Sequence, residues 1–115
     1  MTPEKIISTI EMYEEKLRAA GIPKTRSPEH LSFRELTVAE LLAHAHYACD
    51  NVKVLARDPA KQRRTGSHLT VVQMCLSFAG WYSRGELMAH NYPDPVPAGS
   101  KPVEGSNFGE PRWAT

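Results

Sequence analysis

The sequence predicts an all-α protein: an N-terminal helix packed on an antiparallel helical hairpin, a short fourth helix, and an extended C-terminal tail rich in proline and glycine. Apolar residues recur at helical spacing in three long segments of the chain. Residue types that cap helices stand before these segments, and glycine or proline stands where helices should end. We therefore expect one helical domain over residues 1–92 and a tail over residues 93–115.

The first helix is expected to follow Thr2 as its cap, with Pro3 as its first residue. Its apolar residues form a narrow seam for packing on one surface: Ile6, Ile10, Tyr13, Leu17 and Ala20. Gly21 suits the left-handed conformation that often ends a helix. Residues 22–36 form a long connector, which we expect to be a loop or one short helical turn.

Two segments separated by a short turn predict the hairpin. Thr37 and Glu40 form a capping box, and the helix they open should end near Arg57. Asp58 then caps a further helix that begins at Pro59 and runs to about Ala79. Such a short connection makes the two helices antiparallel neighbours.

The second helix of the hairpin carries more apolar surface than its partner can cover. One stripe is Leu69, Val72, Leu76 and Ala79, and the other is Val71, Cys75, Phe78 and Tyr82. The second stripe needs either the first helix or another copy of the chain, so we expect a homo-oligomer. Gly66, near the middle of this helix, lowers the stability of the helix by about 1 kcal/mol relative to alanine.

A second capping box, Ser83 with Glu86, predicts the short fourth helix through His90. From Pro93 onward, five prolines and three glycines predict a tail without regular structure. Phe108 and Trp113 within this tail would be suited to anchor it on a partner or on a groove of the protein's own oligomer.

Composition narrows the class of protein. The formal net charge of +1 provides no global attraction to nucleic acid or membranes. The chain has no signal-peptide pattern and no bilayer-spanning apolar run, so we expect a cytoplasmic protein. Cys49 and Cys75 fall within apolar helical patterns and are interpreted as small buried hydrophobes.

The strongest candidate for a site is a basic cluster around the hairpin turn. Residues 51–70 contain five cations against Asp58 alone, a local charge of +4: Lys53, Arg57, Lys61, Arg63 and Arg64. His68 lies one turn further along. Arginine guanidinium groups and a helix start favour a phosphate or another anion. The alternative is a solvated helix end whose cations face water or pair with acids of the first helix.

Other chemistries have little support. His44 and His46 lie two residues apart on one helix and cannot grip one metal ion together, so we expect no metal and no cofactor. We interpret them as polar helix surface or as hydrogen-bonding groups at an interface. Ser67 and His68 face apart on a helix, and Cys75 has no local histidine. The acids of the first helix look like solvated surface. We therefore expect no enzyme.

The segment from Arg64 to Asn91, about a quarter of the chain, resembles small uncharacterised helical proteins of phages and prophages. An R-x3-H-L-x3-Q core and a following G-x-Y-S-x2-E-L-x2-H-N run carry the likeness: Arg64, His68, Leu69 and Gln73, then Gly80, Tyr82, Ser83, Glu86, Leu87, His90 and Asn91. The helical layout is also similar to phage sponge proteins of the anti-CBASS and anti-Thoeris type, which sequester cyclic-nucleotide or cyclic ADP-ribose signals.

That second resemblance implies pockets built between hairpins of an oligomer and lined by cations and a stacking aromatic. The residues of this kind here are Arg57, Lys61, Arg63, Arg64 and His68, with Tyr47 or Tyr13 as the aromatic. Our first hypothesis is therefore a non-enzymatic counter-defence protein that binds and sequesters a small phosphorylated nucleotide. The alternative is a protein-binding inhibitor or adaptor that acts through the third helix or the tail, with no small ligand.

Overall fold

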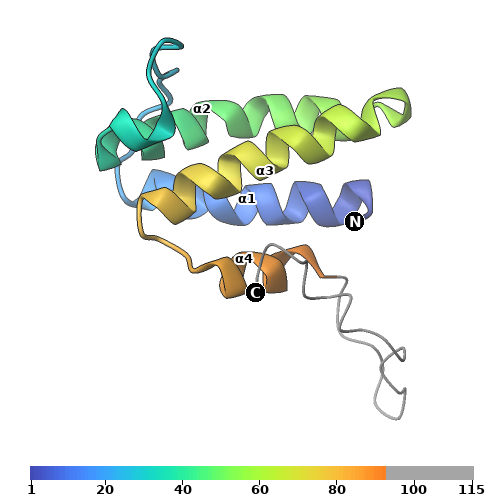
Figure 1. The fold of residues 1–115 in the computed structure, drawn as a ribbon. Coiled ribbons are helices and arrows are strands. Elements are labelled where there is room, and N and C mark those ends of the chain that lie inside the picture. The colour runs from blue at the N-terminus through green and yellow to red at the C-terminus, as the bar shows by residue number, and fades with distance from the viewer. Residues whose placement is uncertain (93–115) are drawn as a thin grey trace.

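The structure, a computed structural model, describes residues 1–92, which form helices and no strands (Figure 1). The α-helices are α1 (Pro3–Ala19), α2 (Val38–Ala56), α3 (Gln62–Phe78) and α4 (Arg84–Asn91), with single 3-10 turns at Phe33–Glu35 and Pro59–Lys61. The predicted tail, with Phe108 and Trp113, lies outside the described residues.

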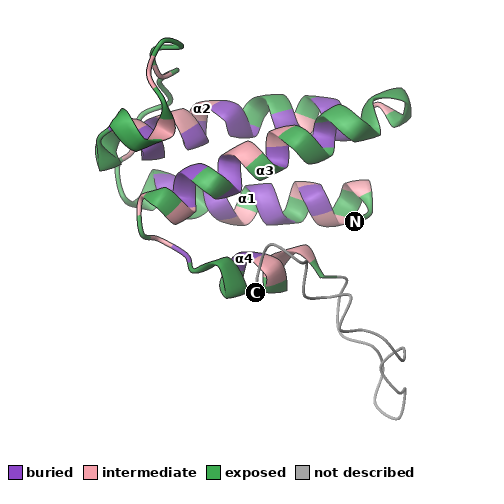
Figure 2. Cartoon of the chain, viewed as in Figure 1, coloured by how far each residue is buried: buried purple, intermediate pink, exposed green. Residues whose placement is uncertain are grey.

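The predicted architecture is confirmed: α2 and α3 form an antiparallel hairpin, α1 packs on it, and the short α4 lies against α1 on the side away from α2 (Figure 1). The buried faces of the three long helices turn toward one another (Figure 2). The largest side chains with almost no exposure are Ile10, Tyr13, Leu17, Val52, Val72 and Leu76. None of the helices over residues 1–92 combines the length and apolarity needed to cross a bilayer.

Local capping explains where the helices begin. The Thr2 hydroxyl accepts a hydrogen bond from the Lys5 amide at 3.1 Å, as predicted. Both capping boxes form, with Glu40 Oε1 accepting from the Thr37 amide at 2.9 Å and Glu86 Oε1 accepting from the Ser83 amide at 2.9 Å.

Helix ends follow the glycines. Gly21 and Gly80 take φ values of 73° and 82°, where a side chain would be strained. One boundary differs from the prediction, because α3 begins at Gln62 and not at Pro59. The Lys61 backbone leaves the helical region, at φ −117° and ψ 27°, so the preceding residues form a separate 3-10 turn that Asp58 caps.

The second apolar stripe of α3 is largely covered within the chain. Cys75 is fully buried, Tyr82 is 8% exposed, and Val71 is half-buried. Phe78 alone remains 55% exposed. Of the two predicted ways to cover this stripe, α1 supplies one, because its Tyr13 ring lies 5.6 Å from that of Tyr82. The stripe therefore gives no strong reason to expect a second copy. The homo-oligomer itself stays a prediction.

Candidate anion-binding surface

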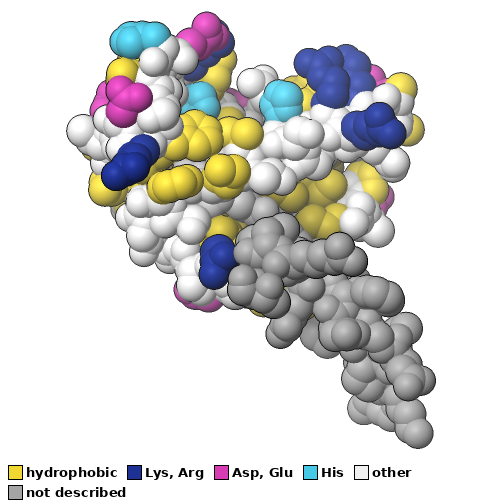
Figure 3. Space-filling model, in the orientation of Figure 1, with side chains coloured by type: hydrophobic (Ala, Val, Ile, Leu, Met, Phe, Trp, Pro, Cys, Tyr) yellow, Lys and Arg dark blue, Asp and Glu magenta, His cyan; other side chains and the backbone are white. Residues whose placement is uncertain are grey.

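Four cations gather at the end of the hairpin, and we call them the hairpin-end cations: Arg57, Lys61, Arg63 and Arg64. All four are exposed, and lysine and arginine side chains crowd over this end of the molecule in Figure 3. Lys61 Nζ lies 3.9 Å from Asp58 Oδ2. Within residues 1–92, no carboxylate lies within ion-pair distance of the three arginines. Their charge is therefore available to an external anion.

Lys53, the fifth cation of the predicted cluster, points elsewhere. Its Nζ lies 2.8 Å from Glu14 Oε1 on α1, and this hydrogen bond raises the pKa of Lys53. Glu14 is only 4% exposed and also lies 3.9 Å from Lys24 Nζ. The prediction of solvated acids on the first helix is wrong for Glu14, which is buried and paired where α1 meets α2.

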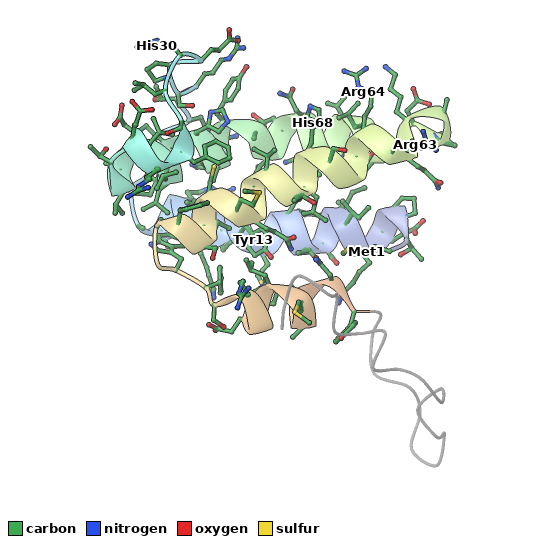
Figure 4. The ribbon with its side chains drawn as sticks, viewed as in Figure 1. Met1, Tyr13, His30, Arg63, Arg64 and His68 are labelled. Atoms are coloured by element: carbon green, nitrogen blue, oxygen red, sulfur yellow. The ribbon has the colours of Figure 1, made fainter. Side chains whose placement is uncertain are left out.

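His68 extends the basic surface along α3. Its Nδ1–H donates to the Arg64 carbonyl oxygen at 3.0 Å, which leaves Nε2 for a ligand. Arg64 and His68 project from the same side of α3, about 6 Å apart along the axis, whereas Arg63 projects from the neighbouring side (Figure 4). The structure thus brings Arg64 and His68 together and separates them from Arg63.

Aromatic rings form a row on the opposite half of the hairpin, and we call it the aromatic ridge: Phe78, Phe33, His44 and Tyr47. Successive ring centroids lie 6.3, 6.4 and 6.0 Å apart. All four rings are partly exposed. Tyr47 lies at the centre of α2 and His68 near the centre of α3, so in the antiparallel hairpin the two residues stand at similar heights along the helices. Of the ridge residues on α2, Tyr47 lies nearer than His44 to the hairpin turn that carries the cations.

Tyr13, the alternative stacking residue, does not belong to this surface. It is 1% exposed, and its hydroxyl lies 2.8 Å from His90 Nδ1 and 3.0 Å from Gln73 Nε2. Burial raises its pKa to about 12. Of the two predicted aromatics, only Tyr47 is accessible to a ligand in the described chain. The sequence did not predict that Phe33 and Phe78 continue the row of rings beyond His44, because no sequence pattern shows where the connector folds back.

The two α2 histidines form hydrogen bonds with the connector, and their interpretation as polar surface is wrong for His46, which is buried. His46 is 5% exposed, and its Nδ1–H donates to the Ile22 carbonyl oxygen at 2.8 Å. His44 Nδ1 accepts the Ser27 amide hydrogen at 3.0 Å. Within residues 1–92, no three histidine, cysteine or acidic side chains are grouped so that they could share a metal ion.

The candidate nucleophiles are engaged or protonated. Both thiols are buried, as predicted, and burial raises the pKa of Cys49 to about 12 and that of Cys75 to about 11. The Ser67 hydroxyl donates to the Arg63 carbonyl oxygen at 3.1 Å and has no bond to His68. Neither thiol is a thiolate at neutral pH, so neither is an activated nucleophile.

None of the hairpin-end cations lines either of two clefts of the described chain, although the first cleft reaches Ala56 and Gln62 beside them. One, of about 440 Å³, lies between the start of α1 and the α3 residues Gln62, Gly66 and Thr70. The other, of about 400 Å³, lies between α3 and α4 and is lined by Met74, Phe78, Leu87 and Met88. A ligand held by the cations and Tyr47 would therefore rest on an open surface of a single chain.

Comparisons with protein-family models, with curated proteins and with solved structures find no match to this chain.

Proposed function

We propose that this protein binds and sequesters a small phosphorylated nucleotide, without chemically changing it, on the surface between the hairpin-end cations and the aromatic ridge. The observation that carries the proposal is the set of three exposed arginines without a carboxylate partner in residues 1–92. Arg64 and His68 would bind phosphate oxygens, and Tyr47 would stack on the base. The resemblance to phage proteins suggests counter-defence, in which such binding removes a cyclic-nucleotide signal.

Charge and ring together favour a nucleotide over a simple anion. Arginines alone would accept any phosphate, but the adjacent row of half-exposed rings adds a surface for a flat, apolar base. Since a single chain offers this surface without a closed pocket, a second copy facing it would enclose the ligand. That homo-oligomer is part of the proposal.

Native mass spectrometry of the purified full chain tests the proposal directly. The protein would be mixed with a panel of cyclic dinucleotides, cyclic trinucleotides and cyclic ADP-ribose isomers. We expect an unmodified ligand to add its mass to a defined oligomer in whole-number stoichiometry. An oligomer that gains no mass with any member of the panel would refute nucleotide binding, and a changed ligand mass would refute the absence of catalysis.

Variants then locate the site. Each charged hydrogen bond contributes about 1.5–3 kcal/mol, so Arg64→Gln should weaken ligand binding at least about tenfold. Tyr47→Leu should weaken binding of the nucleotide and leave the affinity for inorganic pyrophosphate unchanged, because pyrophosphate has no base to stack on the ring. The matched control is Arg18→Gln, an exposed arginine on α1 that pairs with Glu15 at 2.5 Å. If the double reversal Arg63→Glu with Arg64→Glu left the affinity unchanged, the site would lie elsewhere.

The second candidate is a protein-binding inhibitor or adaptor, which the exposed apolar side chains of α3 favour. Phe78 and Met74 are 55% and 41% exposed beside the cleft between α3 and α4. Removal of residues 93–115 separates nucleotide sequestration from an adaptor that acts through the tail. Sequestration of a nucleotide should survive this deletion, whereas loss of function with an intact oligomer would favour an adaptor that acts through the tail.

A further inference from the structure

Four polar side chains join α4 to the body of the protein: Asn91 and His90 of α4, Gln73 of α3 and Tyr13 of α1, which is labelled in Figure 4. Gln73 Nε2 lies 2.7 Å from Asn91 Oδ1 and 3.0 Å from the Tyr13 hydroxyl oxygen. Asn91 Nδ2 lies 3.2 Å from Gln73 Oε1, and the Tyr13 hydroxyl lies 2.8 Å from His90 Nδ1.

The hydrogens in this network can be assigned from its donors and acceptors. An amide NH2 group only donates, so Gln73 Nε2 gives one hydrogen to Asn91 and the other to the Tyr13 oxygen. Tyr13 already accepts from Gln73, and its own hydrogen has His90 Nδ1 as its acceptor. His90 Nδ1 must then be unprotonated. The network is complete only with a neutral imidazole.

The surroundings of His90 disfavour a positive charge. Its ring lies between two tyrosines, with centroid distances of 5.5 Å to Tyr13 and 4.9 Å to Tyr82. Burial and Lys16 of α1 lower the pKa of His90, with a smaller contribution in the same direction from Lys5 and an opposing one from Glu86. Lys16 Nζ itself lies 4.8 Å from the centroid of the Tyr82 ring, so a second cation would form close to the first.

Protonation of Nδ1 leaves a donor without an acceptor. If Tyr13 keeps its orientation, two hydrogens point at each other along the 2.8 Å contact. If the Tyr13 hydroxyl turns away, its hydrogen loses its acceptor in a side chain that is 1% exposed. Few other contacts fix α4 to the rest of the protein, because Leu87 is its single buried residue.

We propose that His90 is a proton-operated latch: the neutral imidazole holds α4 on α1 and α3, and the imidazolium releases it. Release uncovers the apolar surface of Tyr13, Tyr82 and Leu87, which is buried in the closed state. Within residues 1–92, Gln73 is the one hairpin side chain in this network and α2 contributes none, so the hairpin stays folded while α4 opens. Mild acidification would thereby change which surface the protein presents.

NMR spectra of the ¹⁵N-labelled full chain between pH 7.5 and 5.0 test the latch. We expect the amide signals of residues 84–91 to move and broaden with the same midpoint as the His90 ring signal. Their hydrogen exchange, corrected for the intrinsic effect of pH, should accelerate at least tenfold relative to residues 45–52 of α2. The proposal is overturned if His90 titrates while α4 signals and exchange stay constant.

Two variants distinguish release of α4 by protonation of His90 from destabilisation of the whole protein at low pH. His90→Asn keeps an acceptor near the Nδ1 position and does not titrate, so α4 should stay closed throughout the pH range. Tyr13→Phe removes the donor, so α4 should exchange fast at both ends of the range, whatever the state of His90. The control is His30→Asn, an exposed histidine of the connector (Figure 4). Opening of α4 with an unchanged midpoint in His90→Asn would refute the latch.

Discussion

Replacing Tyr13 with phenylalanine removes one oxygen from the place where α1, α3 and α4 meet. The ring keeps its volume and its contact with Tyr82, whose centroid lies 5.6 Å away. Two hydrogen bonds disappear, one from Gln73 Nε2 and one to His90 Nδ1. The substitution therefore leaves buried polar groups without a hydrogen-bond partner, while the apolar packing of the core stays the same.

The magnitude follows from these two bonds. Loss of a neutral hydrogen bond costs about 1 kcal/mol when the remaining partner can bond to water, and about 1–3 kcal/mol when that partner is left buried and unsatisfied. Gln73 is 6% exposed, so its freed N–H cannot easily reach water, whereas half-buried His90 can. We expect the free energy of unfolding to fall by about 2–4 kcal/mol. For a domain of this size, that lowers the melting temperature by about 8–30 °C.

Urea denaturation followed by circular dichroism measures this difference, with Tyr92→Phe as the matched control. Tyr92 is 44% exposed and its hydroxyl belongs to no hydrogen bond within residues 1–92, so its substitution should change stability by less than about 0.5 kcal/mol. A Tyr13→Phe protein within 0.5 kcal/mol of the parent, roughly, would refute the network as a source of stability.

Gly66→Ala should stabilise the protein by up to about 1 kcal/mol, because α3 runs through Gly66 and an added Cβ meets no atom within 4 Å; a lower urea midpoint would contradict this. Gly80→Ala should instead cost about 1–2 kcal/mol, because its φ is 82°, and an unchanged midpoint would argue against that conformation. Burial and Arg26 lower the pKa of His44, so the stability from its bond to Ser27 is present above pH 6.5 and is lost as the pH falls through the folded-state pKa. Denaturation from pH 7 to 5 should show this loss, and His44→Asn should reduce the slope. Cys49 and Cys75 should resist a disulfide reagent at pH 8 until guanidinium unfolds the chain, and rapid labelling of the native protein would show that one thiol is accessible.

Helix boundaries were predictable because short-range chemistry sets them. A hydroxyl and a glutamate three residues apart satisfy each other's backbone amides, so Thr37 and Ser83 mark helix starts without help from the rest of the fold. Lys61 shows where this fails. Its non-helical backbone belongs to the tight connection between α2 and α3, and no residue type in the sequence signals it.

The composition of the candidate site was only partly predictable. Local charge identified the arginines at the hairpin end, but helical periodicity says which face a side chain occupies and not which helix lies opposite. Lys53 was therefore counted with the surface cations, although Glu14 of α1 binds it at 2.8 Å. Phe33 joins the ridge because His44 and His46 hold the connector on α2, and these contacts are invisible in the sequence.

The contacts of Tyr13 also bear on the order in which the chain folds. The turn between α2 and α3 joins neighbours in sequence, whereas Tyr13 and His90 lie 77 residues apart. Contacts between residues close in sequence form fastest, so the hairpin should assemble first and α4 should pack on α1 last. During synthesis, α1 leaves the ribosome long before its partner helix exists. If synthesis stopped before His90, α4 would be incomplete and the surface around Tyr13 would stay uncovered. Such a chain would be a substrate for the proteases that remove incomplete proteins.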